Sequence, residues 1–163
     1  MNLYIMQHGP CLPQEVHAEQ PLSPVGREQI ATTAQAMRIM GLWFDAVLCS
    51  PRAAAMQTAR IVAEGMGYST SCVTALPELA PATSIKACLE AMRPFERHQA
   101  VFVCGHLPLL ADAASHLLST GPKLSLALEN SALLCLSVPN LSARGGALRW
   151  LLQPPQLQMI AAS

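Results

Sequence analysis

Three short polar clusters hold the residues of this sequence that are best suited to chemistry. They are Gln7-His8-Gly9, Ser50-Pro51-Arg52 and Gly105-His106. Imidazole, hydroxyl and guanidinium groups can all donate hydrogen bonds, so together they would suit an anion. A helix beginning near Arg52 would add backbone N–H groups and the positive end of its dipole. The alternative is that His8 and His106 only satisfy loop carbonyls, but two histidines, each beside a glycine, favour the functional interpretation.

Each cluster directly follows a short apolar run. The runs Leu3–Met6, Ala46–Cys49 and Ala100–Cys104 are typical of strands covered on both faces. Longer amphipathic stretches separate them, as in a sheet whose strands alternate with helices. In an open α/β sheet, ligands bind outside the carboxyl ends of the strands. We therefore expect the three clusters to meet at one edge of the sheet.

The remaining elements complete this alternation. Ser23-Pro24 is typical of a helix start and Gly41 of its end. Further helices are predicted at Arg52–Met66, at Ser84–Met92 and after Pro108, and further strands at Ala132–Val138 and Leu148–Gln153, joined by a turn at Asn140–Gly146. The pattern predicts the α/β class: a three-layer sandwich with a mostly parallel central sheet. The length suits a single domain over residues 1–163.

The composition excludes several classes of protein. Of the 163 residues, 52% are hydrophobic and 12% are charged, and ten Lys and Arg balance ten Asp and Glu. Disordered chains lack such apolar content, and nucleic-acid binders need a basic excess, so we expect neither. No apolar run reaches the ~18 residues of a membrane helix, so no membrane partner is expected. The low charge is compatible with an oligomer.

Cysteine usage indicates a cytoplasmic protein. The six cysteines include no C-x-x-C pair, and several lie in apolar runs. We interpret them as buried reduced thiols, with a disulfide framework as the alternative. No basic residue precedes the first apolar stretch, so the N-terminus is not typical of a signal peptide. No set of histidines, cysteines and acids has metal-ligand spacing, so neither a metal nor a cofactor is expected.

Four motifs in order resemble the histidine phosphatase superfamily, and SixA-type phosphohistidine phosphatases most closely. The motifs are Ile5-Met6-Gln7-His8-Gly9, Pro21-Leu22-Ser23-Pro24-Val25-Gly26, Leu48-Cys49-Ser50-Pro51 with Gln57-Thr58-Ala59, and Cys104-Gly105-His106-Leu107-Pro108. Pro77-Glu78-Leu79 and Asn130-Ser131-Ala132 resemble later segments of the SixA type. The likeness runs from Met1 to about Gln153 and implies the phosphoglycerate-mutase-like fold of that superfamily.

The resemblance implies a role for each matching residue. His8 would attack phosphorus and become phosphorylated, and His106 would stabilise the phosphoryl group in transfer. Gln7, Gly9, Ser50 and Arg52 would contact the phosphate, with capping of the next helix as the alternative role of Ser50. Glu78 would be a possible acid for the leaving group, although it also suits a loop entry.

The sequence departs from the family pattern at both pocket arginines. Gln7 occupies the first of these positions and Ala54 the second. Losing two charged hydrogen bonds costs ~3–6 kcal/mol, or roughly 10²–10⁴ in rate. Without these cations, we also expect His8 to be protonated more often. Arg52 replaces one of them if the chain at residue 52 is extended, and points away if it is helical.

Three functions follow from these residues. The first is a SixA-like phosphatase of impaired activity that hydrolyses a phosphohistidine (a phosphoramidate) or a phosphomonoester. The second is a catalytically inactive pseudophosphatase that binds a phosphorylated protein or another partner through the same pocket. The third is an oligomeric scaffold. The short loop Pro10–Gln20 favours a protein-borne phosphate over a small phosphoester.

Overall fold

A computed structural model describes residues 1–163. It contains one six-stranded sheet with the order β3-β2-β4-β1-β5-β6. The strands are β1 (Asn2–Gln7), β2 (Ala46–Cys49), β3 (Val73–Ala75), β4 (Ala100–Gly105), β5 (Leu133–Ser137) and β6 (Ala147–Leu152). The pairings among the first four strands are parallel, whereas β5 and β6 are antiparallel to their neighbours. The predicted α/β fold with a mostly parallel sheet is therefore confirmed.

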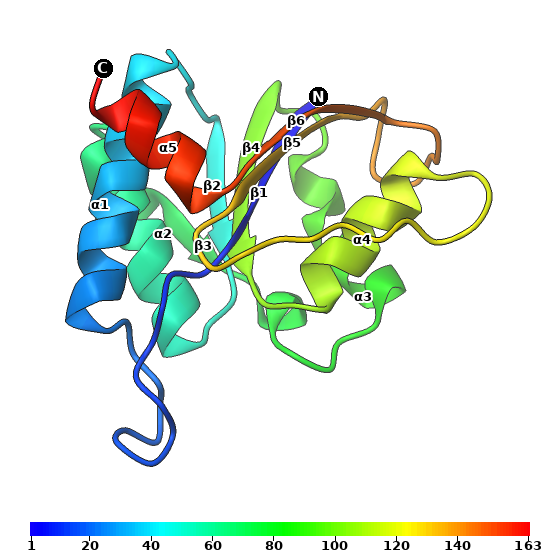
Figure 1. Ribbon diagram of the computed structural model, residues 1–163. Coiled ribbons are helices and arrows are strands. Elements are labelled where there is room, and N and C mark those ends of the chain that lie inside the picture. The colour runs from blue at the N-terminus through cyan, green and yellow to red at the C-terminus, as the bar shows by residue number, and fades with distance from the viewer.

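Helices cover both faces of the sheet (Figure 1). On one face lie α1 (Pro24–Ile39), α2 (Ala53–Gly65) and α5 (Pro154–Ala161), and on the other lie α3 (Ile85–Met92) and α4 (Leu109–Leu118). Each face has its own buried apolar cluster, because the strand residues alternate between the two. No helix is both long and apolar enough to cross a membrane.

The strand register brings the predicted clusters to one edge. Gln7 of β1 pairs with Gly105 of β4, and Cys49 of β2 pairs with Cys104. The ladders continue one residue further, because His8 N donates to Gly105 O at 3.1 Å and Ser50 N donates to Cys104 O at 2.9 Å. His8, Ser50 and His106 therefore leave the sheet side by side.

The loop from Pro10 to Leu22 projects from this same edge (Figure 1). An isolated bridge between Cys11 and Leu22 closes its base. Gly26, in the first turn of α1, lies against the carbonyl of Pro10, so closely that a Cβ at this position would overlap that oxygen. Ser23 caps α1 by accepting from Gly26 N at 3.0 Å. The loop is thus joined to α1 by backbone contact.

The structure differs from the predicted elements in three places. The short edge strand β3 and the helix α5 were not predicted, and α5 begins at two prolines after a capping box formed by Gln153 and Gln156. The second helix begins at Ala53, so Arg52 is its extended N-cap residue, with φ −67° and ψ 145°.

All six cysteines are free, but Cys72 is exposed and Cys11 only partly buried, so the prediction of buried thiols is correct for the other four.

Candidate active site

His8 and His106 face each other at the carboxyl ends of β1 and β4. Their ring centroids are 4.9 Å apart and the ring planes are inclined by 59°. Both side chains line one cavity of about 220 Å³. Two imidazoles that border a single space can contact the same small group.

The ring of His8 is held in one tautomer. Its Nδ1 lies 2.7 Å from the carbonyl oxygen of Gly9. A carbonyl only accepts hydrogen bonds, so Nδ1 carries the proton and donates it. In the neutral ring, Nε2 therefore has a free lone pair, which is the form that a nucleophile requires.

Gly9 supports His8 rather than a ligand. Its N–H donates to Thr58 Oγ1 at 3.1 Å, and Thr58 Oγ1 in turn donates to the carbonyl of Ala54 at 2.8 Å. A Cβ at Gly9 would lie 2.8 Å from Ile30 Cγ1, so only glycine lets the loop approach α1 this closely. The sequence-based assignment of Gly9 as a phosphate ligand is therefore not supported, since its donor is already used.

Asn130 and Ser131, in the segment just before β5, fix the backbone of His8. Asn130 Nδ2 donates to His8 O at 3.1 Å, and Ser131 N donates to the same oxygen at 3.2 Å. Ser131 has a left-handed backbone with φ 70°. The sequence offered Asn130-Ser131 only as a family-like segment, because nothing local indicates a contact 122 residues away.

Ser50 forms a hydrogen bond with the ring of His106. Its hydroxyl lies 3.1 Å from His106 Nε2 and accepts a hydrogen bond from Arg52 N at 3.3 Å. Ser50 is fully buried and does not line the cavity. It makes no side-chain cap of α2. Ser50 therefore orients His106 instead of facing a ligand.

Arg52 lines the cavity together with both histidines. The backbone of Arg52 is extended, which is the condition under which we expect its side chain to replace one of the two arginines of the family pattern. Ala54 borders the same cavity with an apolar side chain. The loop between β1 and α1 adds Cys11, Ala18, Glu19 and Gln20, and Pro81 closes the lining. These loop residues were not predicted, because no motif marks them.

Gln7 and Glu78 do not reach the cavity. With its amide oriented for hydrogen bonding, Gln7 donates to the carbonyls of Leu128 at 2.8 Å and Glu129 at 3.2 Å. Glu78 lies close enough to Cys88 for its charge to raise the pKa of that thiol, after the larger effect of burial. Neither residue is among those that line the cavity. The structure therefore does not support Gln7 as a phosphate ligand or Glu78 as the acid.

Burial keeps both imidazoles neutral. It lowers the pKa of His8, and the hydrogen bond to the Gly9 carbonyl offsets part of this effect. Burial also lowers the pKa of His106 to about 4, with smaller contributions from His8 and then from Arg52. Desolvation thus disfavours the charged ring of His8, which acts against the protonation expected from the absence of the two arginines.

The comparisons with known proteins agree with this fold. Residues 3–82 match the model of the histidine phosphatase superfamily (branch 1). Among solved structures, the protein histidine phosphatase SixA complexed with tungstate aligns with a TM-score of 0.84 and 23% identity, covering 96% of this chain and 99% of that one. No curated protein matches the sequence.

Two further structures share the fold at lower identity. The α-ribazole phosphatase from Shigella flexneri has a TM-score of 0.68 and 17% identity over 94% of this chain and 97% of its own. A phosphoserine phosphatase from Entamoeba histolytica has a TM-score of 0.67 and 14% identity over 92% and 95%. The family recognised from the motifs is therefore the one whose model matches residues 3–82, and the solved structures share the fold over almost the whole chain.

Proposed function

We propose that this chain is a SixA-like phosphatase of reduced activity, which hydrolyses a phosphohistidine or a phosphomonoester through a phospho-His8 intermediate. The observation that carries the proposal is the pair of imidazoles, His8 and His106, 4.9 Å apart at one small cavity. Arg52 lines the same cavity and supplies a positive charge. A phosphoryl group needs such donors when negative charge gathers on its oxygens.

The proposed reaction has two steps. In the first, the Nε2 lone pair of His8 forms a bond to phosphorus while the bond from phosphorus to the leaving nitrogen or oxygen breaks, and the leaving group takes a proton from water. In the second, water attacks phospho-His8, the N–P bond breaks, and inorganic phosphate leaves. His106, oriented by Ser50, donates a hydrogen bond to the phosphoryl oxygens in both steps.

The size of the cavity favours a phosphate carried by a protein. At about 220 Å³ it is smaller than the ~300–1,000 Å³ of a cavity that encloses a whole ligand. A phosphoryl group fits inside, and the rest of the substrate remains outside. We therefore propose a phosphohistidine on a partner protein in preference to a small phosphoester.

A specific observation favours a second candidate function. The amide of Gln7 is bonded to the carbonyls of Leu128 and Glu129, and Ala54 is apolar, so two family cations are absent from the cavity. A catalytically inactive relative would keep the imidazole pair as a binding site for a phosphorylated protein. Turnover distinguishes the two functions.

Phosphate release is the test. Phosphoramidate, a phosphohistidine peptide and an aryl phosphate are offered to the unmodified protein, to His8→Ala and to His98→Ala, an exposed histidine control. The phosphatase proposal predicts slow turnover that His8→Ala abolishes and His98→Ala leaves unchanged. The double variant Gln7→Arg with Ala54→Arg is expected to be about 10²–10⁴ faster.

Two results would decide against the phosphatase. Turnover that survives in His8→Ala would show contamination by another enzyme. Turnover seen only in the double arginine variant would establish the inactive, binding function for the natural sequence.

The six free cysteines support a reducing compartment, and we propose the cytoplasm.

A further inference from the structure

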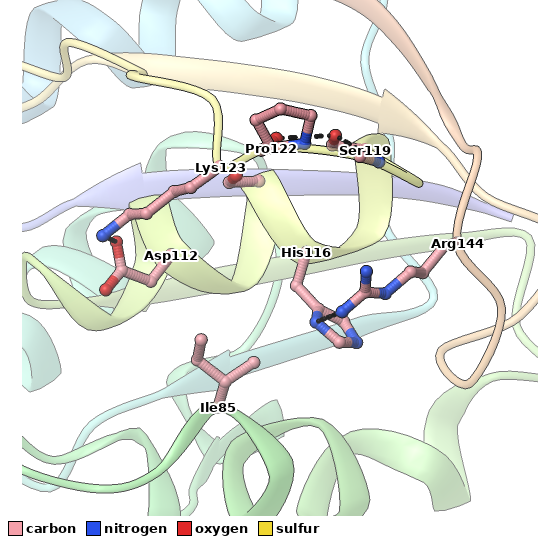
Figure 2. A pocket seen from close by; sticks show the side chains of 9 residues that line it. Ile85, Asp112, His116, Ser119, Pro122, Lys123 and Arg144 are labelled. Atoms are coloured by element: carbon pink, nitrogen blue, oxygen red, sulfur yellow. Dashed lines mark hydrogen bonds and ion pairs between the residues drawn. The ribbon is translucent and has the colours of Figure 1, made fainter.

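A second polar cavity lies along α4, away from the two imidazoles of the candidate active site (Figure 2). Its volume is about 210 Å³. Asp112 and His116 lie on α4, with Lys123 beside Asp112 at one end of the cavity and Arg144 beside His116 at the other. Ile85, at the start of α3, is its single apolar lining residue. The cavity is thus built mainly from charged and hydrogen-bonding groups.

Arg144 carries a charge that no carboxylate neutralises. Its Nη2 lies 3.1 Å from His116 Nδ1, and because a guanidinium has no acceptor, Arg144 donates and the ring nitrogen accepts. The single ion pair of the structure joins Lys123 and Asp112, at 2.6 Å. The cavity therefore holds two cations against one anion.

The hydrogen bond to Arg144 also fixes the tautomer of the His116 ring. With Nδ1 accepting, the proton of the neutral ring is on Nε2, which becomes a donor. The other N–H groups of Arg144 remain available as well. This cavity offers several donors around one excess positive charge, which is the requirement for holding an oxyanion.

The segments that carry the two cations are tied to α4. Leu124 N donates to Ser115 Oγ at 2.7 Å, and Gly121 N donates to Ser119 Oγ at 3.1 Å, so the turn that bears Lys123 is fixed at both ends. On the other side, Gly146 N donates to Leu117 O at 2.9 Å, two residues beyond Arg144. The backbone of both segments is therefore held in place before a ligand arrives, which lowers the entropy cost of binding.

A larger cavity with a mixed apolar and charged lining adjoins this one. It has a volume of about 420 Å³ and shares Ile85 and His116 with the first. Leu89 and Leu141 are its other apolar lining residues, and its polar lining adds Lys86, Glu90, Arg93 and Ser142. An anion that carried an apolar chain would place its charge at Arg144 and its chain over these side chains.

We propose that Arg144, His116 and Lys123 form a second oxyanion site, which takes a carboxylate or phosphate bearing an apolar group, and that the adjoining cavity holds the apolar group. The site is separate from the His8–His106 cavity and does not depend on the proposed phosphatase activity. The ligand's oxygens would accept from Arg144 and from His116 Nε2, while Lys123 stays paired with Asp112 and adds its charge.

The test uses three small probes on the full-length protein: acetate, hexanoate and inorganic phosphate. Histidine ring signals are followed by NMR at constant ionic strength during each titration. We expect saturable shifts of His116 with all three probes. Hexanoate is expected to bind about tenfold more tightly than acetate, which corresponds to the removal from water of about two of its four additional carbons. Phosphate is also expected to shift His8 and His106, at its own saturation point.

Variants distinguish binding of the probes at this site from non-specific electrostatic attraction to the protein. Arg144→Gln is expected to lower the affinity of all three probes, measured at His116, by about tenfold or more. Arg27 is an exposed arginine on α1, and Arg27→Gln is expected to leave these affinities unchanged. Ile85→Ala is expected to reduce the advantage of hexanoate only. Unchanged His8 and His106 signals show that each variant is folded.

Three results would overturn the proposal. One is the absence of a saturable His116 shift at concentrations up to about 100 mM, far above the millimolar range of weak specific sites. Another is an equal response in Arg144→Gln. Equal binding of acetate and hexanoate would overturn the part that concerns the adjoining cavity.

Discussion

The two imidazoles are kept neutral mainly by burial, since desolvation is the largest cause of the lowered pKa of both His8 and His106. Both rings therefore disfavour the charged form, although positions 7 and 54 hold glutamine and alanine rather than a cation. Arg52 is the cation that lines the remaining cavity. Glu19, which also lines it, opposes the binding of an anion.

Replacement of Arg52 is the first prediction. Arg52→Gln removes one charged contact worth ~1.5–3 kcal/mol, so affinity for tungstate is expected to fall by roughly 10–100-fold. Isothermal titration calorimetry measures this change, with Arg27→Gln as the matched control. An unchanged affinity in Arg52→Gln would mean that the guanidinium does not contact the anion.

The second prediction concerns pH. The pKa of His106 is lowered to about 4 from its usual value near 6.5, so the unfolded chain binds the proton more readily between these values. The stability that neutral His106 confers is complete above pH 6.5 and is lost as the pH falls toward 4. The free energy of unfolding, measured with urea at several pH values, should decline less steeply as the pH falls in His106→Gln than in the unmodified protein. Equal slopes would contradict the lowered pKa.

At the scale of elements, the sequence predicted the parts of the site that lie at strand ends. Buried strands β1, β2 and β4 are continuous apolar runs, and the polar residues that follow them mark the edge. The edge strand β3 has only three residues, two of them exposed, so it leaves no periodic signal. The helix α5 begins with two prolines, which resemble a loop when no partner surface is known.

The supporting contacts were beyond prediction for a related reason. Thr58 and Asn130 contact Gly9 and His8 from positions 49 and 122 residues away. Their hydrogen bonds depend on how α2 and the segment before β5 pack, which no local pattern encodes. The same applies to Gln7, whose amide finds backbone carbonyls of a distant segment.

Thr58 provides the third prediction. Thr58→Val leaves the buried N–H of Gly9 without a partner, at a cost of ~1–3 kcal/mol, and the Tm is expected to fall by roughly 2–10 °C. Thr32→Val is the matched control, because Thr32 also donates to a carbonyl one helical turn earlier but holds no other segment. Calorimetry that finds equal losses in both variants would contradict the role of Thr58.

The fourth prediction tests the contact between the projecting loop and α1. Gly26→Ala forces a methyl group against the Pro10 carbonyl and is expected to destabilise the protein by ~1–3 kcal/mol. Gly121→Ala, where a Cβ meets nothing within 4 Å, is the control and should change the unfolding midpoint little. Equal midpoints for both variants would show that the loop adjusts freely.

At the scale of the whole molecule, two helical layers around one sheet separate two polar cavities. One lies at the carboxyl ends of the strands and contains His8 and His106, and the other lies along α4 and contains His116 and Arg144. The first was predicted from strand ends and family motifs. The second could not be, because its residues come from a helix, a turn and the β5–β6 connection, and nothing in the sequence pairs them.

Both proposed functions require that His8 and His106 hold one oxyanion between them. Tungstate binding, followed through the histidine ring signals by NMR, tests this requirement most directly. The structure predicts that the signals of His8 and His106 shift together and saturate at the same tungstate concentration, and that His8→Ala weakens the response of His106. Independent titration of the two rings, or no response from either, would contradict it.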